Sequence, residues 1–442
     1  MTTDGAAPAD GGDELAGLAL GPALDSARTL GRAGGAGAAA MDGAGSPRHA
    51  ASSSKPNGAA QDHGFCKRIG PSILERGAQR PSVEPHNQPA HSAAFERYLT
   101  AAHLPGLDGL RGLAILPVVW HHATPRPLEG IWGKGAVGVD LFFALSGFLI
   151  TTLLLRERRQ RPLQLGAFYW RRALRIFPLY YLVLAAYALH ALWLPGSPAA
   201  QHFLRSLPYH ASYTANWLVD YAVPHDVMFA FSWSLCVEEQ FYLVWPVLLA
   251  LVARREVLAA AMLLAIGLDA AAEHGALSAL LPAGSLGLRV LTSFAAPIGF
   301  GSLLALLLDT PRGFTLAERA LGGRWAAPLL LLGCVLLLAL PVTPYLLLAP
   351  CLAALVAAVA LTPTHGLRFV LERPALRFLG TLSYGVYLLH VTALGVVRRA
   401  LPEHREQAWL VFGLGLPLAL VLAALVHFTV ERPLRKLRWR FR

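Results

Sequence analysis

Charged residues are scarce in this sequence. Asp, Glu, Lys and Arg together make up 15% of its 442 residues, whereas a soluble globular domain carries about 25%. Hydrophobic residues make up 55%, and the mean hydropathy is +0.47. Because such a chain cannot cover a folded surface with charge, the composition excludes an ordinary soluble domain and predicts a membrane protein.

Cysteine is also rare, and its spacing follows no pattern. The four cysteines are Cys66, Cys236, Cys334 and Cys351, and three of them lie in apolar runs. Neither a disulfide framework nor a cysteine metal site has this spacing, so we expect small buried hydrophobic residues and no metal.

Acidic residues are fewer than basic ones, 27 against 38, which gives a net charge of +11. The basic residues lie in short loops between apolar runs, which is typical of membrane proteins. We therefore expect the lipid bilayer as a partner and no nucleic acid.

The first 98 residues lack any sustained apolar pattern and are rich in Ala, Gly, Ser and Pro. Such a segment cannot bury enough apolar surface to offset its ordering entropy. We predict a disordered, low-complexity segment at 1–98, with no apolar signal-peptide core, and a membrane domain at 99–442.

From Leu107 onward, ten apolar runs are long enough to cross a bilayer. They predict an all-α polytopic membrane protein with about ten transmembrane helices. The loops RERRQRP and WRRALR after the second run place that side in the cytoplasm by the positive-inside rule, so both termini are expected there. The runs lie at 107–124, 137–155, 175–194, 230–252, 257–275, 288–308, 325–341, 344–361, 378–399 and 407–429.

The first run, LDGLRGLAILPVVWHH, carries an arginine and a histidine on one helical face. Arg111 and His122 are eleven residues apart, which in a helix means about 20° of rotation and about 16 Å of rise. His121 lies about 80° away from Arg111, so His122 is the better partner. An ionisable group in such a helix indicates function, although both side chains also suit snorkelling to the two interfaces.

Three carboxylates are predicted at the outer depth of His122. Asp140 begins the second run, and Glu238 lies in the outer half of the fourth, beside Glu239. A histidine beside a carboxylate suits general base catalysis, because the carboxylate stabilises the imidazolium. A structural ion pair between helices is the alternative. Tyr242 shares the face of Glu238 at i+4.

Arg172 and Arg175 are three residues apart on one face of the third helix, near the predicted depth of Arg111. Guanidinium groups suit phosphates, so an anionic ligand entering from the cytoplasm is expected there; ordinary positive-inside charge is the alternative. In the ninth run a polar stripe of Ser383, Tyr387 and His390 predicts either contacts between helices or the lining of a cavity.

Five motifs in this order resemble the acyltransferase 3 family of integral membrane proteins: LDGLRGLAILPVVWHH, GVDLFFALSGFLIT, FYWRRALRIFPLYY, WSLCVEEQFYLVWP and LSYGVYLLH. The family includes O-antigen acetylases and exopolysaccharide acetylases. Its arginine–ten residues–histidine motif matches Arg111 and His122, its arginine–two residues–arginine motif matches Arg172 and Arg175, and its acidic residue matches Glu238.

The resemblance implies a cell (inner) membrane O-acyltransferase. It would move an acyl group, usually acetyl from acetyl-CoA, to a hydroxyl of a carbohydrate or glycolipid acceptor, such as a surface polysaccharide, a lipopolysaccharide or a glycosylated metabolite. His122 would act as the base or carry the acyl group. A secondary transporter and a non-catalytic protein on the same fold are the alternatives. The expected residues are His122, Glu238 and Asp140 in catalysis, Arg111, Arg172 and Arg175 at acetyl-CoA, and Ser146, Tyr242, Ser383, Tyr387 and His390 along the cavity.

Overall fold

The structure is a computed structural model that describes residues 93–101, 103–124, 130–223 and 227–436. The structure divides into two compact units: of the described residues, those from 104 onward belong to the larger unit, and 93–101 with 103 belong to the smaller. All of the predicted site residues lie in the larger unit, which is described from residue 104 onward.

The segment predicted to be disordered lies mostly outside the described residues, at 1–92. Its last part, 93–98, belongs to helix α2 (Ala93–Thr100). Glu96 in the first turn and Arg97 in the last complement the helix dipole, which favours this helix locally. The predicted boundary at residue 98 falls within this helix, and the division into a disordered segment and a membrane domain stays a prediction.

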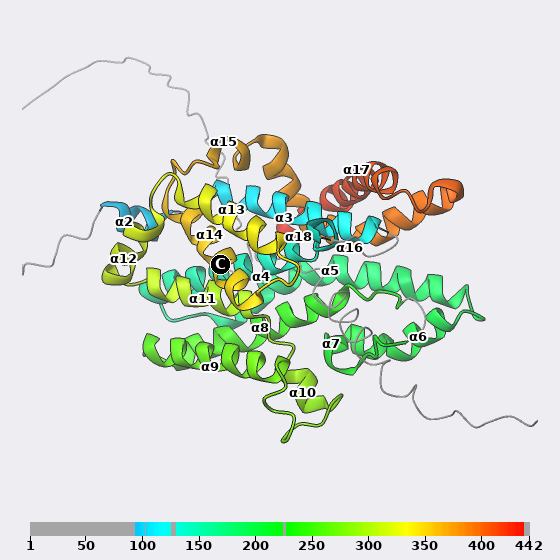
Figure 1. Ribbon diagram of the computed structural model, residues 1–442, viewed down its shortest axis with the longest axis horizontal. Helices are drawn as coiled ribbons and strands as arrows, with labels where there is room; N and C mark the ends of the chain where they lie inside the picture. The colour runs from blue at the N-terminus through cyan, green and yellow to red at the C-terminus, as the bar shows by residue number, and fades with distance from the viewer. Residues whose placement is uncertain (1–92, 102, 125–129, 224–226, 437–442) are drawn as a thin grey trace, which may run out of the picture. The chain divides into compact units, whose positions relative to one another are not determined.

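All regular elements described in the larger unit are helices (Figure 1), which confirms the all-α prediction. Each predicted apolar run overlaps one principal helix: α3 (Pro105–Ala123), α4 (Val137–Gln160), α5 (Leu165–Leu192), α8 (Ser232–Leu251), α9 (Arg255–Glu273), α11 (Ala296–Leu308), α13 (Ala326–Ala339), α14 (Tyr345–Leu361), α16 (Pro374–Ala400) and α17 (Ala408–Val426). Shorter helices connect them: α6 (Pro198–Ala211), α7 (Ala215–Leu218), α10 (Leu286–Leu291), α12 (Pro311–Leu321), α15 (Arg368–Leu371), α18 (Arg432–Lys436), the single turns η1 (Gly130–Gly133) and η2 (Pro402–His404), and a π-helical turn, η3 (His427–Glu431).

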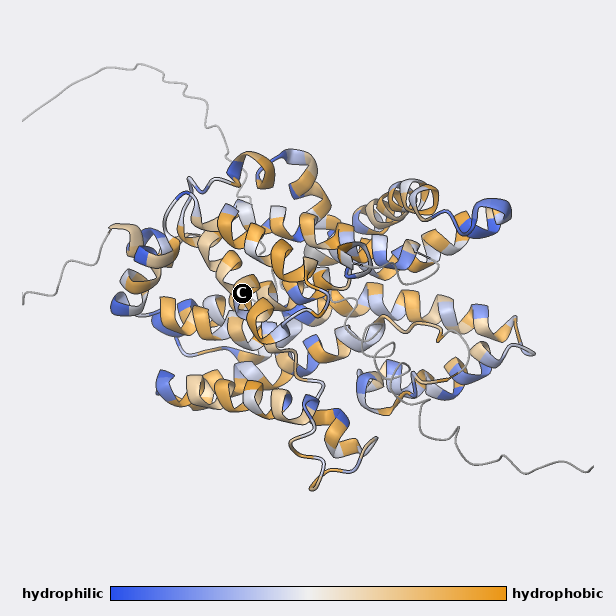
Figure 2. Cartoon of the chain, in the orientation of Figure 1, coloured by the Kyte–Doolittle hydropathy of each residue, from blue (hydrophilic) through white to orange (hydrophobic). Residues whose placement is uncertain are grey.

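The number of ten membrane spans is not confirmed. Within the described residues, five helices are long and apolar enough to cross a bilayer, or six if α12 and α13, bent by 71°, form one span. The run at 288–308 is broken between α10 and α11, where Pro297 stands at the start of the second helix; proline is tolerated there because its missing N–H is not needed. Hydrophobic residues nevertheless make up most of the helical ribbon (Figure 2), as expected for a multi-pass membrane protein.

Principal helices that follow one another along the chain of the larger unit run in opposite directions. The side chains of the predicted site therefore lie toward one or the other of its two ends. Gly138 of α4 packs on the carbonyl of Ala114 in α3, while Gly135 packs on that of Pro117, which makes these helices antiparallel. In contrast, α16 runs parallel to α3 and meets its last residues. We call the end where α3 and α16 finish and α4 and α8 begin the histidine end, and the opposite end the arginine end.

Two further helix pairs pack backbone against backbone. A Cβ atom on Gly380 of α16 would lie 1.9 Å from the carbonyl oxygen of Asp108 in α3. A Cβ atom on Gly147 of α4 would lie 1.9 Å from the carbonyl oxygen of Ile298 in α11. Only glycine permits such an approach, which is a common way to pack helices in membranes. The helices that carry the predicted site are therefore held at fixed spacing.

Candidate functional site

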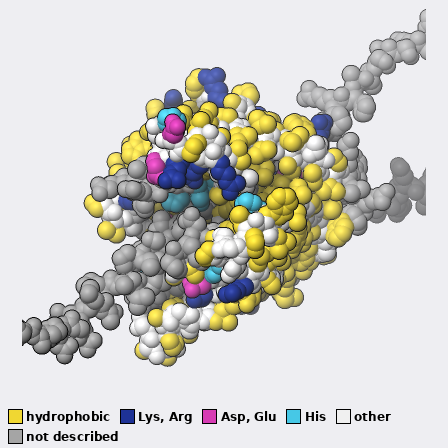
Figure 3. Space-filling view, turned by 90° about the vertical axis from the view of Figure 1, so that its right-hand side faces the viewer, with side chains coloured by type: hydrophobic (Ala, Val, Ile, Leu, Met, Phe, Trp, Pro, Cys, Tyr) yellow, Lys and Arg dark blue, Asp and Glu magenta, His cyan; other side chains and the backbone are white. Residues whose placement is uncertain are grey.

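Two histidines meet at the histidine end. The ring centroids of His122 in α3 and His390 in α16 are 4.7 Å apart, and the rings are nearly perpendicular. His390 is fully buried, whereas His122 is partly exposed. In a view toward the histidine end, His, Lys and Arg side chains gather around a hollow in the surface (Figure 3). The structure thus places together two residues that are 268 positions apart (390 − 122) in the sequence.

Both imidazoles are held through the same ring nitrogen. Nδ1 of His122 is 3.0 Å from the carbonyl oxygen of Val118, and Nδ1 of His390 is 2.5 Å from that of Tyr387. Because a carbonyl only accepts, each Nδ1 carries the proton and each Nε2 keeps a lone pair. Nε2 of His390 is buried without a hydrogen-bond partner among the described residues. A hydroxyl group placed between the rings would find two acceptors.

His121 faces a different surface from His122. A Cβ atom on Gly135 would lie 3.0 Å from Cβ of His121, so this histidine packs against the turn that precedes α4. The rings of His121 and His122 are 5.2 Å apart. Of these two adjacent histidines, it is His122 whose ring packs against His390 of α16.

Arg398 fixes the end of α3 that carries His122. Its Nη2 donates to the carbonyl oxygens of His122 and Ala123 at 2.9 and 3.0 Å. The last carbonyls of a helix have no partner within the helix, and a cation there also complements the dipole. Sequence analysis did not predict this contact, because it joins segments far apart in the chain.

A buried carboxylate lies deeper in the larger unit. Glu238 is 1% exposed, and it accepts hydrogen bonds from the hydroxyls of Ser146 and Tyr242. The guanidinium carbon of Arg172 lies 3.4 Å from the centre of the Tyr242 ring. A buried carboxylate requires such donors. The predicted cavity residues Ser146 and Tyr242 thus bind the predicted acidic residue.

The three predicted arginines lie close to this carboxylate. Arg111 is 1% exposed, and its guanidinium lies close enough to Arg175 and Glu238 to interact with their charges. Nε and Nη2 of Arg172 are buried and find no hydrogen-bond acceptor among the described residues. Arg171, in contrast, forms an ion pair with Glu157 at 3.8 Å. Unused guanidinium N–H groups beside like charges suit an anionic ligand such as a phosphate.

Asp140 lies at a different depth from His122, whereas the sequence predicts the same depth for both. Asp140 follows Gly138, which packs beside Ala114, and Ala114 lies eight residues, or about 12 Å, before His122 in α3. Because the glycines let α4 pack against the middle of α3, Asp140 lies below the depth of His122. Its Oδ1 accepts a hydrogen bond from Tyr345 at 2.8 Å.

His122 also lacks the expected carboxylate partner. Within the described residues, the only hydrogen bond of its ring is to the Val118 carbonyl. Glu238 belongs to the arginine cluster instead. A backbone carbonyl therefore orients the imidazole, while the catalytic roles of Glu238 and Asp140 stay predictions.

The polar stripe of α16 divides between two tasks. The hydroxyl of Tyr387 donates to the carbonyl oxygen of Phe231 at 2.5 Å and lies 3.1 Å from Oγ of Ser234. Tyr387 thus joins α16 to the start of α8, whereas His390 pairs with His122. Ser383 is 2% exposed. Across the described part of the chain, no group of three His, Cys, Asp or Glu side chains is arranged to hold a metal ion.

Comparisons with known proteins agree with the motifs. The acyltransferase domain family matches residues 104–428. The chain is 28% identical over 370 residues to the peptidoglycan O-acetyltransferase OatA of Listeria monocytogenes, covering 76% of this chain and 56% of that protein. It is 29% identical over 377 residues to the putative peptidoglycan O-acetyltransferase YrhL of Bacillus subtilis, covering 78% and 56%.

A putative O-acetyltransferase of Staphylococcus aureus is 34% identical over 164 residues, which cover 35% of this chain and 26% of that protein. The chain spans at most about half the length of these curated relatives. No solved structure matches. Since the family match covers most of the sequence and contains all five motifs, the chain belongs to the acyltransferase domain family.

Proposed function

We propose that this protein is a membrane O-acetyltransferase that moves an acetyl group from acetyl-CoA to a hydroxyl of a carbohydrate acceptor. The observation that carries the proposal is the imidazole pair, with an unprotonated Nε2 on each ring. The family and the names of its relatives support acyl transfer, and those names favour a peptidoglycan-type sugar over a lipopolysaccharide or a glycosylated metabolite.

In this mechanism His122 is the general base. Its Nε2 takes the proton of the acceptor hydroxyl while the hydroxyl oxygen forms a bond to the thioester carbonyl carbon. The carbon–sulfur bond then breaks, and the imidazolium returns its proton to the leaving thiolate. A general base of this kind contributes about 10²–10⁴-fold to the rate. The Val118 carbonyl holds Nδ1–H throughout and keeps Nε2 directed away from its own helix.

His390 would stabilise the protonated state of His122. Once Nε2 of His122 carries a proton it is a donor, and the adjacent Nε2 of His390 is an acceptor without another partner among the described residues. A second route remains within the proposal, in which Nε2 of His122 first accepts the acetyl group itself. In both routes the same nitrogen reacts.

The arginine end would receive the donor. Arg111, Arg172 and Arg175 offer guanidinium groups to the phosphates of coenzyme A, and the unused N–H groups of Arg172 support this role. With the arginine end in the cytoplasm, as the positive-inside rule predicts, the donor approaches from inside and the acceptor from outside. Glu238, hydrogen-bonded to Tyr242 beneath Arg172, would hold these arginines in place.

The test is acetyl transfer by the purified full chain. Acetyl-CoA labelled in its acetyl group is incubated with a peptidoglycan-type oligosaccharide, and the product is analysed by mass spectrometry. We expect label in an ester on the sugar, and none with His122→Ala. Label that crosses a vesicle membrane without entering a covalent product would instead support a secondary transporter.

A further inference from the structure

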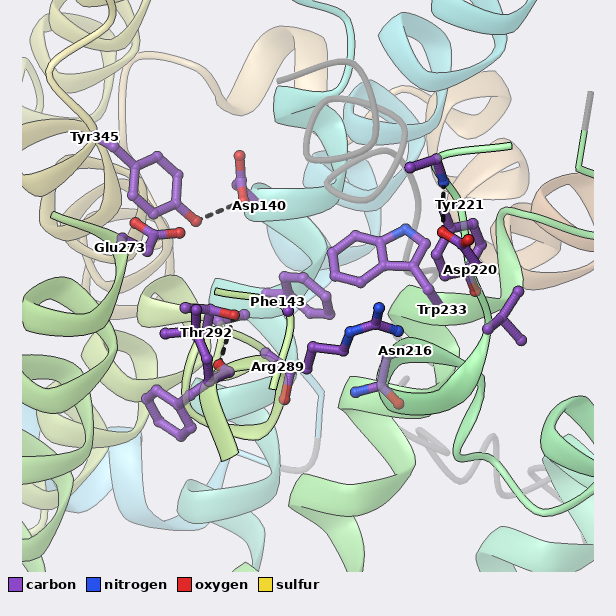
Figure 4. A pocket seen from close by; sticks show the side chains of 17 residues that line it. Asp140, Phe143, Asn216, Asp220, Tyr221, Trp233, Glu273, Arg289, Thr292 and Tyr345 are labelled. Atoms are coloured by element: carbon purple, nitrogen blue, oxygen red, sulfur yellow. Dashed lines mark hydrogen bonds between the residues drawn. The ribbon is translucent and has the colours of Figure 1, made fainter. Parts of the chain in front are cut away.

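A pocket of about 250 Å³ lies on the other side of the first turn of α8 from the histidine pair. Phe231 at the start of α8 packs on His390, with ring centroids 5.7 Å apart, and Trp233 two residues later lines the pocket. Figure 4 shows Tyr345, Glu273 and Asp140 on one side of it and Trp233 on the other. None of the steps above uses this pocket.

Aromatic side chains form much of its wall. Phe143, Tyr221, Trp233 and Tyr345 come from four separate segments of the chain and all line the pocket. Flat aromatic rings pack well against the C–H faces of sugar rings, because these faces are apolar while the hydroxyls at the ring edge stay free to bond. A pocket with apolar walls and a few polar groups is the usual form of a small-molecule site.

Two wall residues carry hydrogen-bond donors that the described part of the protein leaves unpaired. Nε1 of Trp233 and the hydroxyl of Tyr221 are buried and have no hydrogen-bond partner among the described residues. Unpaired buried donors are rare in native proteins, and each requires an explanation. A ligand with acceptor oxygens in the pocket provides one.

The charge of the lining selects among sugars. Asp140, Asp220 and Glu273 contribute three carboxylates and Arg289 one guanidinium, so the lining has a formal charge of −2 (−3 + 1). Oδ1 of Asp220 accepts from the backbone N–H of Ala222 at 2.9 Å, and carboxylate oxygens of this kind accept hydrogen bonds from hydroxyl or ammonium groups. A carboxylate on the ligand would be repelled.

From these observations we infer that the pocket binds a sugar unit of the acceptor that carries no negative charge, away from the hydroxyl that reacts at His122. This inference rests on the proposed function and names the substrate class that the function leaves open. Binding of a remote part of a substrate helps to position its reacting group. The acceptor therefore spans at least two sugar units, one in the pocket and one beside the histidines.

The experiment measures binding of tetrasaccharides to the purified full chain, without acetyl-CoA, by isothermal titration. Three β-1,4-linked probes differ in charge: N-acetylglucosamine units are neutral, glucosamine units are cationic, and glucuronic acid units are anionic. We expect the anionic probe to bind at least tenfold more weakly than the neutral one. Asp220→Asn combined with Glu273→Gln should reduce this difference.

Conservative variants test the pocket itself. Trp233→Phe and Tyr221→Phe keep an aromatic ring at each position but remove the unused donor, and each should weaken binding of the neutral probe several-fold. Glu403→Gln makes the same chemical change as Glu273→Gln at an exposed carboxylate outside the pocket lining, and should leave binding unchanged.

The outcomes separate the pocket from the chemistry. No binding of the neutral probe, equal binding of all three probes, or no effect of the pocket variants overturns the inference. If acetyl transfer occurs but the pocket variants leave the acceptor KM unchanged, the proposed function stands without the pocket. If the pocket binds sugars as described but no transfer is detected, the inference stands and the proposed function fails.

Discussion

The guanidinium of Arg398 is hydrogen-bonded to the backbone oxygen of His122 at 2.9 Å. Arg398 and His390 lie two turns apart on α16, so the helix that supplies the second imidazole also caps the helix that supplies the first. Helix α16 therefore fixes the positions of both rings, because it carries His390 and also binds the end of α3 that carries His122. This arrangement gives Arg398 a positioning role without contact to the substrate.

Replacing Arg398 should lower kcat and leave the KM for acetyl-CoA unchanged. We expect Arg398→Ala to cost on the order of tenfold in kcat, because small displacements of a catalytic group reduce its effect strongly. Arg398→Lys should recover part of the loss, since it keeps one donor but not the planar fork. Steady-state kinetics measure this split, with Arg399→Ala as the neighbouring control. A rise in acetyl-CoA KM at constant kcat would contradict the role.

His122→Ala should abolish transfer, whereas His121→Ala should leave most of the activity. The expected loss for His122 is about 10²–10⁴-fold, the usual contribution of a general base. His121 packs against the turn before α4 and does not pair with His390. Activity is measured by label transfer after both variants elute as folded protein. An active His122→Ala protein would exclude this residue as the base.

Arg172→Ala should raise the KM for acetyl-CoA far more than that for the acceptor. A charge-assisted hydrogen bond contributes about 1.5–3 kcal/mol, which corresponds to roughly ten- to over a hundred-fold in affinity. Arg175→Ala should act in the same direction, and lysine at either position should recover only part. Arg171→Ala is the control, because Arg171 is paired with Glu157. Wild-type binding of acetyl-CoA to Arg172→Lys and Arg175→Lys would place the donor elsewhere.

Gly380→Ala should destabilise the protein, while Gly395→Ala on the same helix should not. The added Cβ at Gly380 would lie 1.9 Å from a backbone oxygen of α3, whereas nothing lies within 4 Å of one at Gly395. Overpacking of this kind costs typically about 1–3 kcal/mol. Thermal unfolding in detergent measures the difference. Equal Tm values for the two variants would show that α3 and α16 separate easily.

Stability should fall as the pH is lowered from about 6.5 toward about 4, in part through His210. Burial in α6 lowers the pKa of His210 to about 4, with a further contribution from His202. Between these pH values the unfolded chain binds the proton and the folded chain does not, so folding loses up to about 3 kcal/mol as the pH falls. His210→Gln removes the group that binds this proton. The Tm of the variant should therefore change less between pH 7.5 and 4.5 than the Tm of the wild type. A pH dependence identical to that of the wild type would refute the assignment.

The helices of this protein are predictable from sequence because an apolar run of bilayer length leaves the backbone few alternatives. The run at 137–155, for example, corresponds to α4. The break before α11 was missed, since only Thr292, Ser293 and Pro297 interrupt the apolar run there. Helix α6 was missed for the opposite reason: it is too polar to stand out as a span.

The site was predictable only where one helix carries it. The shared face of Arg111 and His122 follows from helical geometry alone. The depth of Asp140 does not, because it depends on how closely Gly138 lets α4 approach α3. The pairing of His122 with His390 is likewise a matter of tertiary packing, although both residues were candidates.

The glycine contact between α3 and α16 has a consequence for how the site works. Where two backbones touch without intervening side chains, neither helix slides or tilts against the other without breaking the contact at Gly380. We therefore expect the imidazole pair to move as one unit during the catalytic cycle. Gates that admit the donor and the acceptor must be built from other helices, and slow steps caused by gating should respond to substitutions outside this pair.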